Sequence, residues 1–329
     1  MRILVTGATG YIGYKLAMEA ARRDHTVHIL VRDLHSPLLP EHPNIVAFKG
    51  DITDKISVLA AMQGCTKVLH AAAIAKLSAR DNSIFFSVNV EGTRNMLEAA
   101  LECRIKKFVF TSSGAVIGPS GNFPMREQDP RIVTFENDYE LSKFMAEELV
   151  KEYNCKGLFT VIVAAPRVYG PGNTCNGNTM HFFLRKILSM RIAFVPFCEN
   201  VVANYAFIDD VVNGHFLAME KGLGGEKYIL GGENLSYRNF FNTLKEKNDK
   251  KILLIPIPTF LFKVWSFFYM LYKHLTNKET HISPKVIDRL AQNRALSCEK
   301  AIRQLGYSVT PFSEGIQRTI LHLKKTIYE

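Results

Sequence analysis

A serine, a tyrosine and a lysine form the clearest chemical pattern in this 329-residue chain. Tyr139 and Lys143 are four residues apart, so on a helix their side chains lie on one face. A free phenol has a pKa of about 10, and a neighbouring ammonium group lowers it toward neutral pH. Ser113 supplies a hydroxyl that can bond a carbonyl oxygen and stabilise developing negative charge. Together the three side chains predict proton transfer to or from an oxygen atom.

The same Tyr-x-x-x-Lys spacing occurs at two other places, Tyr11 with Lys15 and Tyr269 with Lys273. Tyr11 lies inside a glycine-rich turn, and Tyr269 lies in an aromatic C-terminal stretch. Tyr139 instead opens a predicted helix downstream of a strand that ends in Thr-Ser-Ser. Context therefore favours Tyr139 as the reactive tyrosine.

The chain opens with a strand, a glycine-rich turn and a helix, the order that a bound dinucleotide requires. Gly7 allows the tight turn, Gly10 lets the backbone approach a pyrophosphate, and Gly13 lets the helix pack close to the strand. The pyrophosphate would sit on unpaired N–H groups at the positive end of the helix. The expected cofactor-binding residues of this turn are Gly7, Thr9, Gly10, Tyr11, Ile12 and Gly13.

Short apolar runs alternate with helical patterns through the first half of the chain, as in βαβ units. The runs are continuous rather than alternating, so we predict an α/β fold with a Rossmann-type doubly wound parallel sheet, covered on both faces. Its ligand crevice should lie at the carboxyl ends of the strands. The predicted strands are 2–6, 26–31, 45–49, 67–71, 107–112 and 159–164, and the predicted helices are 12–23, 56–62, 90–103 and 139–153.

The pattern breaks after Pro166, where turn-rich runs at 170–173 and 176–178 precede an expected helix over 180–190. The later part of the chain is expected to form a smaller C-terminal substrate-binding lobe beside the dinucleotide-binding domain. The expected division is 1–168 for the dinucleotide-binding Rossmann domain, with 203–221 returning to it, and 169–202 with 222–329 for the lobe.

Composition and charge limit the kinds of binding partner that this chain is expected to have. The chain is 47% apolar and 22% charged, an ordinary globular balance, with a net charge of +10. Residues 241–329 hold 15 Lys and Arg against 7 Asp and Glu, which gives +8 of that total. The basic excess surrounds an apolar stretch at 252–275 and no nucleic-acid motif is present, so an amphiphilic substrate or a membrane surface fits better than nucleic acid. The aromatic run 260–275 is expected to be a helix that covers the substrate cleft or, alternatively, makes a peripheral membrane contact.

The chain opens directly on its first strand, without the pattern of a secretory leader. Its six cysteines form no Cys-x-x-Cys pair and no metal-ligand spacing. We therefore expect reduced thiols, no metal site and a cytoplasmic protein, with membrane association as the alternative.

Motifs spread over nearly the whole chain resemble those of the extended short-chain dehydrogenase/reductases, the NAD-dependent epimerase/dehydratase superfamily. The resemblance is strongest to their dihydroflavonol reductase and 3β-hydroxysteroid dehydrogenase-like branch. Each motif is modest alone, and jointly they are highly specific. They are TGATGYIG, GDITD, HAAA, VNVEGT, TSSGAVIG, YELSK and PRVYGPG, followed by Asp209-Asp210 and KAIRQLGY at 300–307.

The resemblance implies a role for each matching position. Tyr139 matches the family's proton donor, and Lys143 matches the residue that lowers its pKa and holds the nicotinamide ribose. Ser113 matches the carbonyl-polarising serine, with Ser112 as the alternative because the strand register can differ by one residue. The other implied cofactor contacts are Asp51 and Ile52 at the adenine, Ala71, Ala72 and Ala73 beside the nicotinamide ribose, and Pro166 and Val168 at the carboxamide. The family also implies a homodimer that pairs helices 90–103 and 139–153.

The end of the second strand bears on the choice between the two nicotinamide cofactors. An acid there would bond the ribose 2′-hydroxyl and repel a 2′-phosphate, whereas an arginine does the opposite. The strand is followed by Arg32, which favours NADP(H) over NAD(H), although Asp33 comes next.

The classes of protein that share these motifs differ in the substrate on which they act. Nucleotide-sugar epimerases often carry an Arg-Asp-Tyr run where this chain has 203–205, Ala-Asn-Tyr. Residues 180–184 are largely apolar, which favours reduction of a hydrophobic ketone such as a 3-keto lipid or a steroid-like molecule. Arg185 or Arg191 could still bind a diphosphate, so a nucleotide-sugar epimerase or dehydratase is the alternative. A non-catalytic NADP-binding sensor is the second alternative, disfavoured because the Ser, Tyr and Lys all persist.

Overall fold

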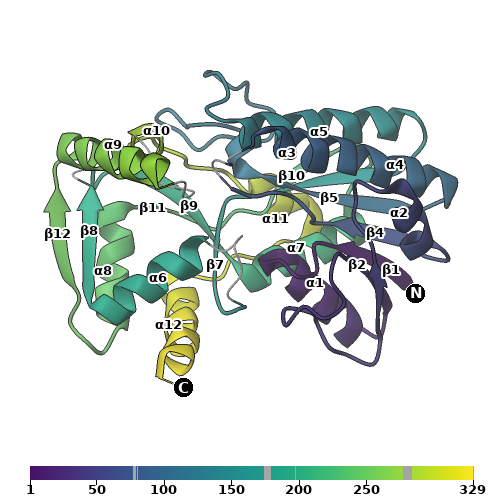
Figure 1. Ribbon diagram of the computed structural model, residues 1–329, viewed down its shortest axis with the longest axis horizontal. Coiled ribbons are helices and arrows are strands. Elements are labelled where there is room, and N and C mark those ends of the chain that lie inside the picture. The colour runs from purple at the N-terminus through teal and green to yellow at the C-terminus, as the bar shows by residue number, and fades with distance from the viewer. Residues whose placement is uncertain (77–78, 80, 174–178, 197, 277–283, 329) are drawn as a thin grey trace.

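A seven-stranded parallel sheet forms the centre of the larger part of the molecule (Figure 1). The computed structural model describes residues 1–76, 79, 81–173, 179–196, 198–276 and 284–328, so the expected turn at 176–178 lies outside the described residues. The strand order is β10-β6-β5-β4-β1-β2-β3, and every neighbouring pair is parallel. The strands are β1 Arg2–Thr6, β2 Thr26–Val31, β3 Ile45–Lys49, β4 Lys67–His70, β5 Lys107–Ser113, β6 Thr160–Ala165 and β10 Lys227–Ile229.

Helices cover both faces of this sheet, because the strands are apolar on both sides. One core contains buried side chains of α1 (Tyr11–Arg22), α7 (Ile208–Lys221) and α11 (Glu299–Leu305). The opposite core contains those of α2 (Lys55–Met62), α4 (Gly92–Glu102) and α5 (Asp138–Cys155). Short turns of helix lie before α4 and after β5: α3 Ser83–Phe86, η1 Ser87–Glu91 and η2 Gly114–Val116. The predicted Rossmann-type doubly wound fold is confirmed.

A smaller lobe lies beside the sheet, at the left of Figure 1. It contains a three-stranded sheet in the order β11-β9-β7 and a parallel pair formed by β8 and β12. Its core is aromatic, with Tyr169, Phe207, Phe240 and Phe312 buried against one another. The elements are β7 Arg167–Tyr169, α6 Thr179–Met190, β8 Ile192–Pro196, β9 Val202–Phe207, β11 Glu233–Ser236, α8 Tyr237–Lys247, β12 Leu253–Ile257, α9 Thr259–Leu275, α10 Pro284–Leu290 and α12 Phe312–Tyr328.

The packing differs from the expected division of the chain at three elements. β10 and α11 fall within the stretch 222–329 expected for the lobe, yet β10 adds a parallel strand beside β6 and α11 packs into a core of the main sheet. Residues 203–207 were expected in the main domain, yet they belong to β9 of the three-stranded sheet. β10 spans only three residues, too few for the sequence pattern to distinguish it from a loop.

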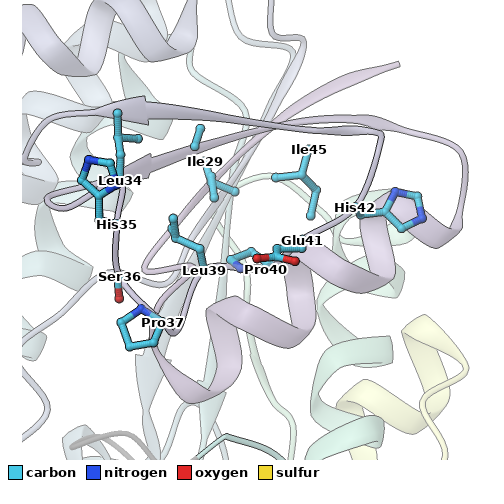
Figure 2. A pocket seen from close by; sticks show the side chains of 11 residues that line it. Ile29, Leu34, His35, Ser36, Pro37, Leu39, Pro40, Glu41, His42 and Ile45 are labelled. Carbon is cyan, nitrogen blue, oxygen red and sulfur yellow. The ribbon is translucent and has the colours of Figure 1, made fainter.

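Residues 32–44 join β2 to β3 without a helix and border an open pocket of about 510 Å³ (Figure 2). Apolar side chains, Ile29, Leu39 and Ile45, lie at its centre, while His35 and His42 lie toward its two ends. In the sheet, β1 and β4 separate β2 from β5. The pocket therefore lies well away from Ser113 at the end of β5.

A buried histidine fastens the first strand to its neighbours. His70, fully buried at the end of β4, has Nδ1 2.6 Å from Thr6 Oγ1 and Nε2 3.1 Å from Thr93 Oγ1. Thr6 Oγ1 accepts a hydrogen bond from the Ala72 amide, and Thr93 Oγ1 donates one to the Asn89 carbonyl. These bonds assign a neutral ring protonated on Nε2, which fixes the end of β1 where the glycine turn begins.

The buried histidines predict a loss of stability in acid. Burial lowers the pKa of His70 to about 3 and of His215 to about 4, both below the ordinary value of about 6.5. Their stabilisation is fully present above pH 6.5 and is lost as the pH falls toward those values, by about 1.4 kcal/mol per pH unit for each ring.

Chemical unfolding at several pH values between 7 and 4.5 measures this effect. In His215→Gln the slope of the unfolding free energy against pH should be shallower by about 1.4 kcal/mol per unit, because one titrating ring is gone. Carboxylates titrate in both proteins, so their contribution cancels when the slope of the variant is subtracted from that of the wild type. Parallel slopes would contradict the assignment.

Candidate functional site

The glycine-rich turn between β1 and α1 forms a tight cradle. Gly7 has a φ of +73°, and a Cβ atom on it would lie 2.8 Å from the Ala71 backbone. A Cβ on Gly13 would lie 2.1 Å from the Gly7 carbonyl oxygen, so α1 approaches β1 as only glycine allows. No side chain caps the start of α1 after Gly10, which leaves its first N–H groups for a ligand. The turn thus fits the phosphates of a dinucleotide.

The tyrosine and lysine that follow this turn have structural contacts instead of catalytic ones. Tyr11 is 6% exposed, and its hydroxyl donates a 2.9 Å hydrogen bond to the Gly170 carbonyl. Lys15 Nζ lies 2.7 Å from the Asp209 carboxylate. Tyr11 therefore ties the glycine turn to the loop after β7, and only its backbone is left for a cofactor.

The positions expected at the adenosine half lie at the carboxyl ends of β2 and β3. Arg32 is exposed, and the Asp33 carboxylate accepts a 2.9 Å hydrogen bond from the His35 amide. Asp51 accepts bonds from the amide and hydroxyl of Thr53, each 2.9 Å. Ile52 is buried in the core, so its backbone is the part free to reach a ligand.

The side chains of the two neighbouring serines at the end of β5 have different surroundings. Ser112 is 5% exposed and donates a short hydrogen bond to Glu147, a carboxylate that also pairs with Lys227. Ser113 lines a cavity, and its hydroxyl accepts a 3.2 Å bond from the Ala115 amide. Of the two serines, Ser113 is therefore the one that lines this cavity.

Tyr139 lies in the first turn of α5 (Asp138–Cys155), close to Ser113. The Ser113 hydroxyl lies close enough to act on the pKa of the Tyr139 phenol, although the residues lie on different elements. Burial raises the pKa of Tyr139, while the Ser113 hydroxyl and the positive charge of Arg289 oppose that rise. The phenol is thus held in its protonated form. The predicted lowering of the Tyr139 pKa by Lys143 is wrong, because burial outweighs the groups that oppose it, which are Ser113 and Arg289.

Lys143 lies one turn further along α5 and is 2% exposed. Its ammonium donates a 2.8 Å hydrogen bond to the Thr111 carbonyl and lies 4.0 Å from the centre of the Phe110 ring. Burial lowers the pKa of Lys143 to about 7, and Glu147 opposes that change. The end of β5 therefore holds the Lys143 side chain on the face of α5 that also carries Tyr139.

The remaining sequence-predicted positions follow the same edge of the sheet. Ala71 and Ala72 follow β4, and the Ala72 amide is held by Thr6. Ala73 continues this loop and is half-buried. Pro166 lies between β6 and β7 and lines the cavity with Ser113, whereas Val168 packs against the core beside α7.

Arg185 and Arg191, the residues considered for a diphosphate, are both exposed and lie outside the lining of that cavity.

A network of buried charges adjoins Tyr139. Glu140 is fully buried and contacts Arg131 at 2.6 Å, Arg289 closely and Arg294 at 3.8 Å. Glu136 accepts bonds from Arg289 at 2.9 Å and from Arg294 at 2.8 Å. Arg131 also donates to the Ala115 and Val116 carbonyls, so it clamps the loop after β5.

The cavity beside Ser113 has a volume of about 110 Å³ and is lined by both lobes. Its polar lining comes from Ser113 and Asn204 and from three arginines, Arg167, Arg289 and Arg294. Asn204 is 1% exposed and holds the segment around Leu296 through bonds to that residue's carbonyl and to Gly232. The cavity thus places positive charge next to the predicted catalytic hydroxyls.

The sequence patterns missed these arginines as site residues. Arg167 lies in the PRVYGPG motif but carried no assigned role, and Arg289 and Arg294 lie in a stretch without any motif. Two isolated β-bridges pair Ala203 with Arg294 and Met125 with Leu296. They bring the stretch that contains Arg289 and Arg294 to the site. The only signal in the sequence was the basic excess of the C-terminal quarter, which did not single out these residues.

Comparison with known proteins places this geometry in a family. Residues 3–231 match the model of the NAD dependent epimerase/dehydratase family, whose members depend on a nicotinamide dinucleotide. The chain is 27% identical over 321 residues to a 3-beta-hydroxysteroid dehydrogenase of Mycolicibacterium neoaurum, covering 93% of this chain and 86% of that protein. It is also 29% identical to a 4-hydroxy-2-methyl-3-oxo-4-farnesyl-3,4-dihydroquinoline-1-oxide ketoreductase of Stigmatella aurantiaca, covering 78% and 76%.

A solved structure agrees over the full length. The crystal structure of gox2253 superposes with a TM-score of 0.81 and 27% identity, covering 98% of each chain. The family expected from the motifs is thereby confirmed, and with it an enzyme of the oxidoreductase or epimerase type. The chain belongs to the NAD dependent epimerase/dehydratase family.

Proposed function

We propose that this protein is an NADP(H)-dependent oxidoreductase that interconverts a hydrophobic ketone and the corresponding alcohol. The observation that carries the proposal is that Ser113, Tyr139 and the buried Lys143 come together at the carboxyl end of β5, where Lys143 bonds the Thr111 carbonyl. Parallel strands present their ligands at this edge, and β1 delivers the glycine turn to the same edge. The names of the dehydrogenase and ketoreductase relatives support this reaction class.

Each residue has a defined part in the proposed reaction. The nicotinamide of a dinucleotide whose phosphates bind at the glycine turn would supply or accept the hydride. The Ser113 hydroxyl donates a hydrogen bond to the substrate carbonyl oxygen, and Tyr139 donates its proton to the oxygen that becomes the alcohol. Because burial raises the pKa of Tyr139, its phenol is protonated and ready to act as the acid in the reduction. Lys143 holds the ribose of the cofactor and stabilises the phenolate that remains.

A substrate panel tests the proposal. Purified protein should oxidise NADPH with at least one lipophilic ketone, such as a 3-ketosteroid or a long-chain keto-lipid. Turnover of UDP- or dTDP-sugars without turnover of any ketone would replace it with the epimerase or dehydratase alternative. Binding of NADPH without turnover in either panel would favour the sensor alternative.

Arg32 is proposed to select NADP(H). Its competitor Asp33 is engaged with the His35 amide, which leaves Arg32 to meet a 2′-phosphate. Arg32→Ala should lower the ratio of kcat/KM for NADPH over NADH by about 10- to 100-fold, because one charge-assisted contact is worth roughly 1.5–3 kcal/mol. The control is Arg22→Ala, an arginine with a side chain 66% exposed on α1. An unchanged ratio would contradict this role.

The aromatic helix α9 is proposed to make the expected peripheral membrane contact over 252–275. Its exposed side chains recur at helical spacing and form a single apolar face: Phe260, Leu261, Val264, Trp265, Phe267, Phe268, Leu271, Tyr272 and Leu275. Among the described helices, none is both long and apolar enough to span a bilayer. An exposed apolar face with lysines at its border is typical of interfacial binding. Sedimentation with phosphatidylserine vesicles tests it, and protein left wholly in the supernatant would refute it.

The homodimer expected from the family is also proposed, through α4 and α5. The outer face of this helix pair carries the exposed Met145 and several ion pairs, among them Lys151 with Glu148. Light scattering should give twice the mass of 37.2 kDa, and the monomer mass would refute the dimer. The cytoplasmic location stays a prediction.

A further inference from the structure

The cavity beside Ser113 carries an excess of buried positive charge. Three guanidinium groups line it, those of Arg167, Arg289 and Arg294, and Arg131 joins the cluster through Glu140, the carboxylate that it shares with Arg289. The carboxylates among them are Glu136 and Glu140, so four positive charges against two negative leave two in excess. Charge buried without a partner is costly, and a site that keeps it needs a counter-ion.

Arg294 shows the excess most directly. It is 9% exposed, and its Nε and Nη1 atoms are buried without a hydrogen-bond partner. Nη2 is hydrogen-bonded to Glu136 and Gln292, while Nη1 lies 3.8 Å from Glu140, beyond hydrogen-bond distance. Burial and the neighbouring Arg289 lower the pKa of Arg294 to about 10. Backbone bonds to Val202 and Asn204 hold the main chain of this arginine beside β9.

Arg167 adds a second charge without a carboxylate among its recorded contacts. Its Nη1 lies 3.3 Å from the Tyr205 hydroxyl and 3.2 Å from the Tyr237 hydroxyl, and its guanidinium lies 5.7 Å from each ring centre. Two neutral phenols position this guanidinium without neutralising it. Arg167 and Arg294 line the same cavity, so a single anion could meet both.

We infer that this cavity is an anion subsite, in which Arg167, Arg289 and Arg294 bind a carboxylate or phosphate group that the substrate carries close to its reacting carbon. The inference rests on the proposed function, because the reacting carbon is placed by Ser113 and Tyr139. Arg289 interacts with both Tyr139 and the carboxylate pair, so the anionic group lies within a few bonds of the ketone or alcohol.

The size of the cavity limits what this group can be. About 110 Å³ accommodates one carboxylate or phosphate with its attached carbon, whereas whole-ligand pockets span about 300–1,000 Å³. A nucleoside diphosphate does not fit inside it. The substrate class is therefore an amphiphilic acid, with its charged group in the subsite and its apolar part outside.

Equilibrium binding tests the subsite without any need for turnover. Decanoate, decyl phosphate and 2-decanone are titrated into the NADP⁺-loaded protein and followed by calorimetry. The wild type should bind at least one of the two anions at least tenfold more tightly than the ketone. Preference between decanoate and decyl phosphate identifies the group. Equal affinity for all three probes would overturn the inference.

Two arginine variants show whether the charge of this cavity is responsible. Arg167→Gln removes a guanidinium without stripping a recorded ion pair from either carboxylate, so it is the variant expected to fold most readily. It should weaken anion binding at least tenfold and leave 2-decanone binding unchanged. Arg294→Lys keeps the charge but loses the planar fork, and it should show a smaller loss. Arg22→Gln, on the exposed surface, should match the wild type. A loss of 2-decanone binding equal to the loss of anion binding would overturn the inference.

Turnover then separates this inference from the proposed function. With NADP⁺, 3-hydroxydecanoate should be oxidised with a lower KM than its methyl ester, and Arg167→Gln should erase that difference. Arginine-dependent binding of anions without oxidation of either compound would refute the oxidoreductase and leave the subsite standing. Oxidation of acid and ester with equal KM would refute the subsite and leave the oxidoreductase standing.

Discussion

Tyr139→Phe should lower kcat by about 10²- to 10⁴-fold, the usual contribution of a positioned general acid. The phenylalanine keeps the ring that packs near Phe85 and loses only the hydroxyl that meets Ser113. Affinity for NADPH should stay within about threefold of the wild type, because the glycine turn lies on separate elements. Steady-state kinetics with the best ketone and a fluorescence titration of NADPH measure the two quantities.

The matched control is Tyr153→Phe, the same chemical change on the same helix. Tyr153 is 5% exposed and lies in the core shared by α4 and α5, away from Ser113. It should retain kcat within a few-fold. Activity in Tyr139→Phe within tenfold of the wild type would rule out Tyr139 as the proton donor.

Glu140→Gln should destabilise the fold by about 3–5 kcal/mol, the cost of removing one partner from a buried ion pair. The carboxylate is fully buried and contacts three arginines, Arg131, Arg289 and Arg294. Glutamine keeps the size of the side chain but removes the carboxylate that Arg131 pairs with, and it leaves Arg289 and Arg294 with Glu136. Chemical unfolding of the two proteins at pH 7 gives the difference.

Glu220→Gln, on α7, is the control for this change. Its side chain is 53% exposed and lies 4.0 Å from Arg23 at the surface, where ion pairs contribute little. It should unfold at nearly the same denaturant concentration as the wild type. Equal midpoints for Glu140→Gln and Glu220→Gln would show that the buried carboxylate does not hold the cluster together.

The main sheet could be predicted from the sequence because its signals are local. β1 to β6 are continuous apolar runs between helical patterns, and each was expected within one residue of its observed bounds. The glycine turn was equally clear, since Gly7 and Gly13 occupy positions where a Cβ would collide with backbone. β10 was missed because three residues carry no recognisable period.

The site was predictable only in part, for the same reason. Tyr139 and Lys143 share one helix, so their spacing showed in the sequence. The choice of Ser113 over Ser112 needed the strand register, which pairs Ser113 with Ala165 at the very end of β6. The arginine cavity is assembled from segments far apart in the chain, and no local pattern reports such a meeting.

The two bridges that bring residues 294–296 back to Met125 and Ala203 also bear on the order of assembly. Contacts between residues so distant in sequence form late, because a long loop must close before they stabilise anything. On the ribosome, the glycine turn, Ser113, Tyr139 and Lys143 all emerge well before Arg289 and Arg294. A chain interrupted near residue 280 would therefore retain the proposed catalytic hydroxyls but lack two of the three arginines that line the cavity beside Ser113.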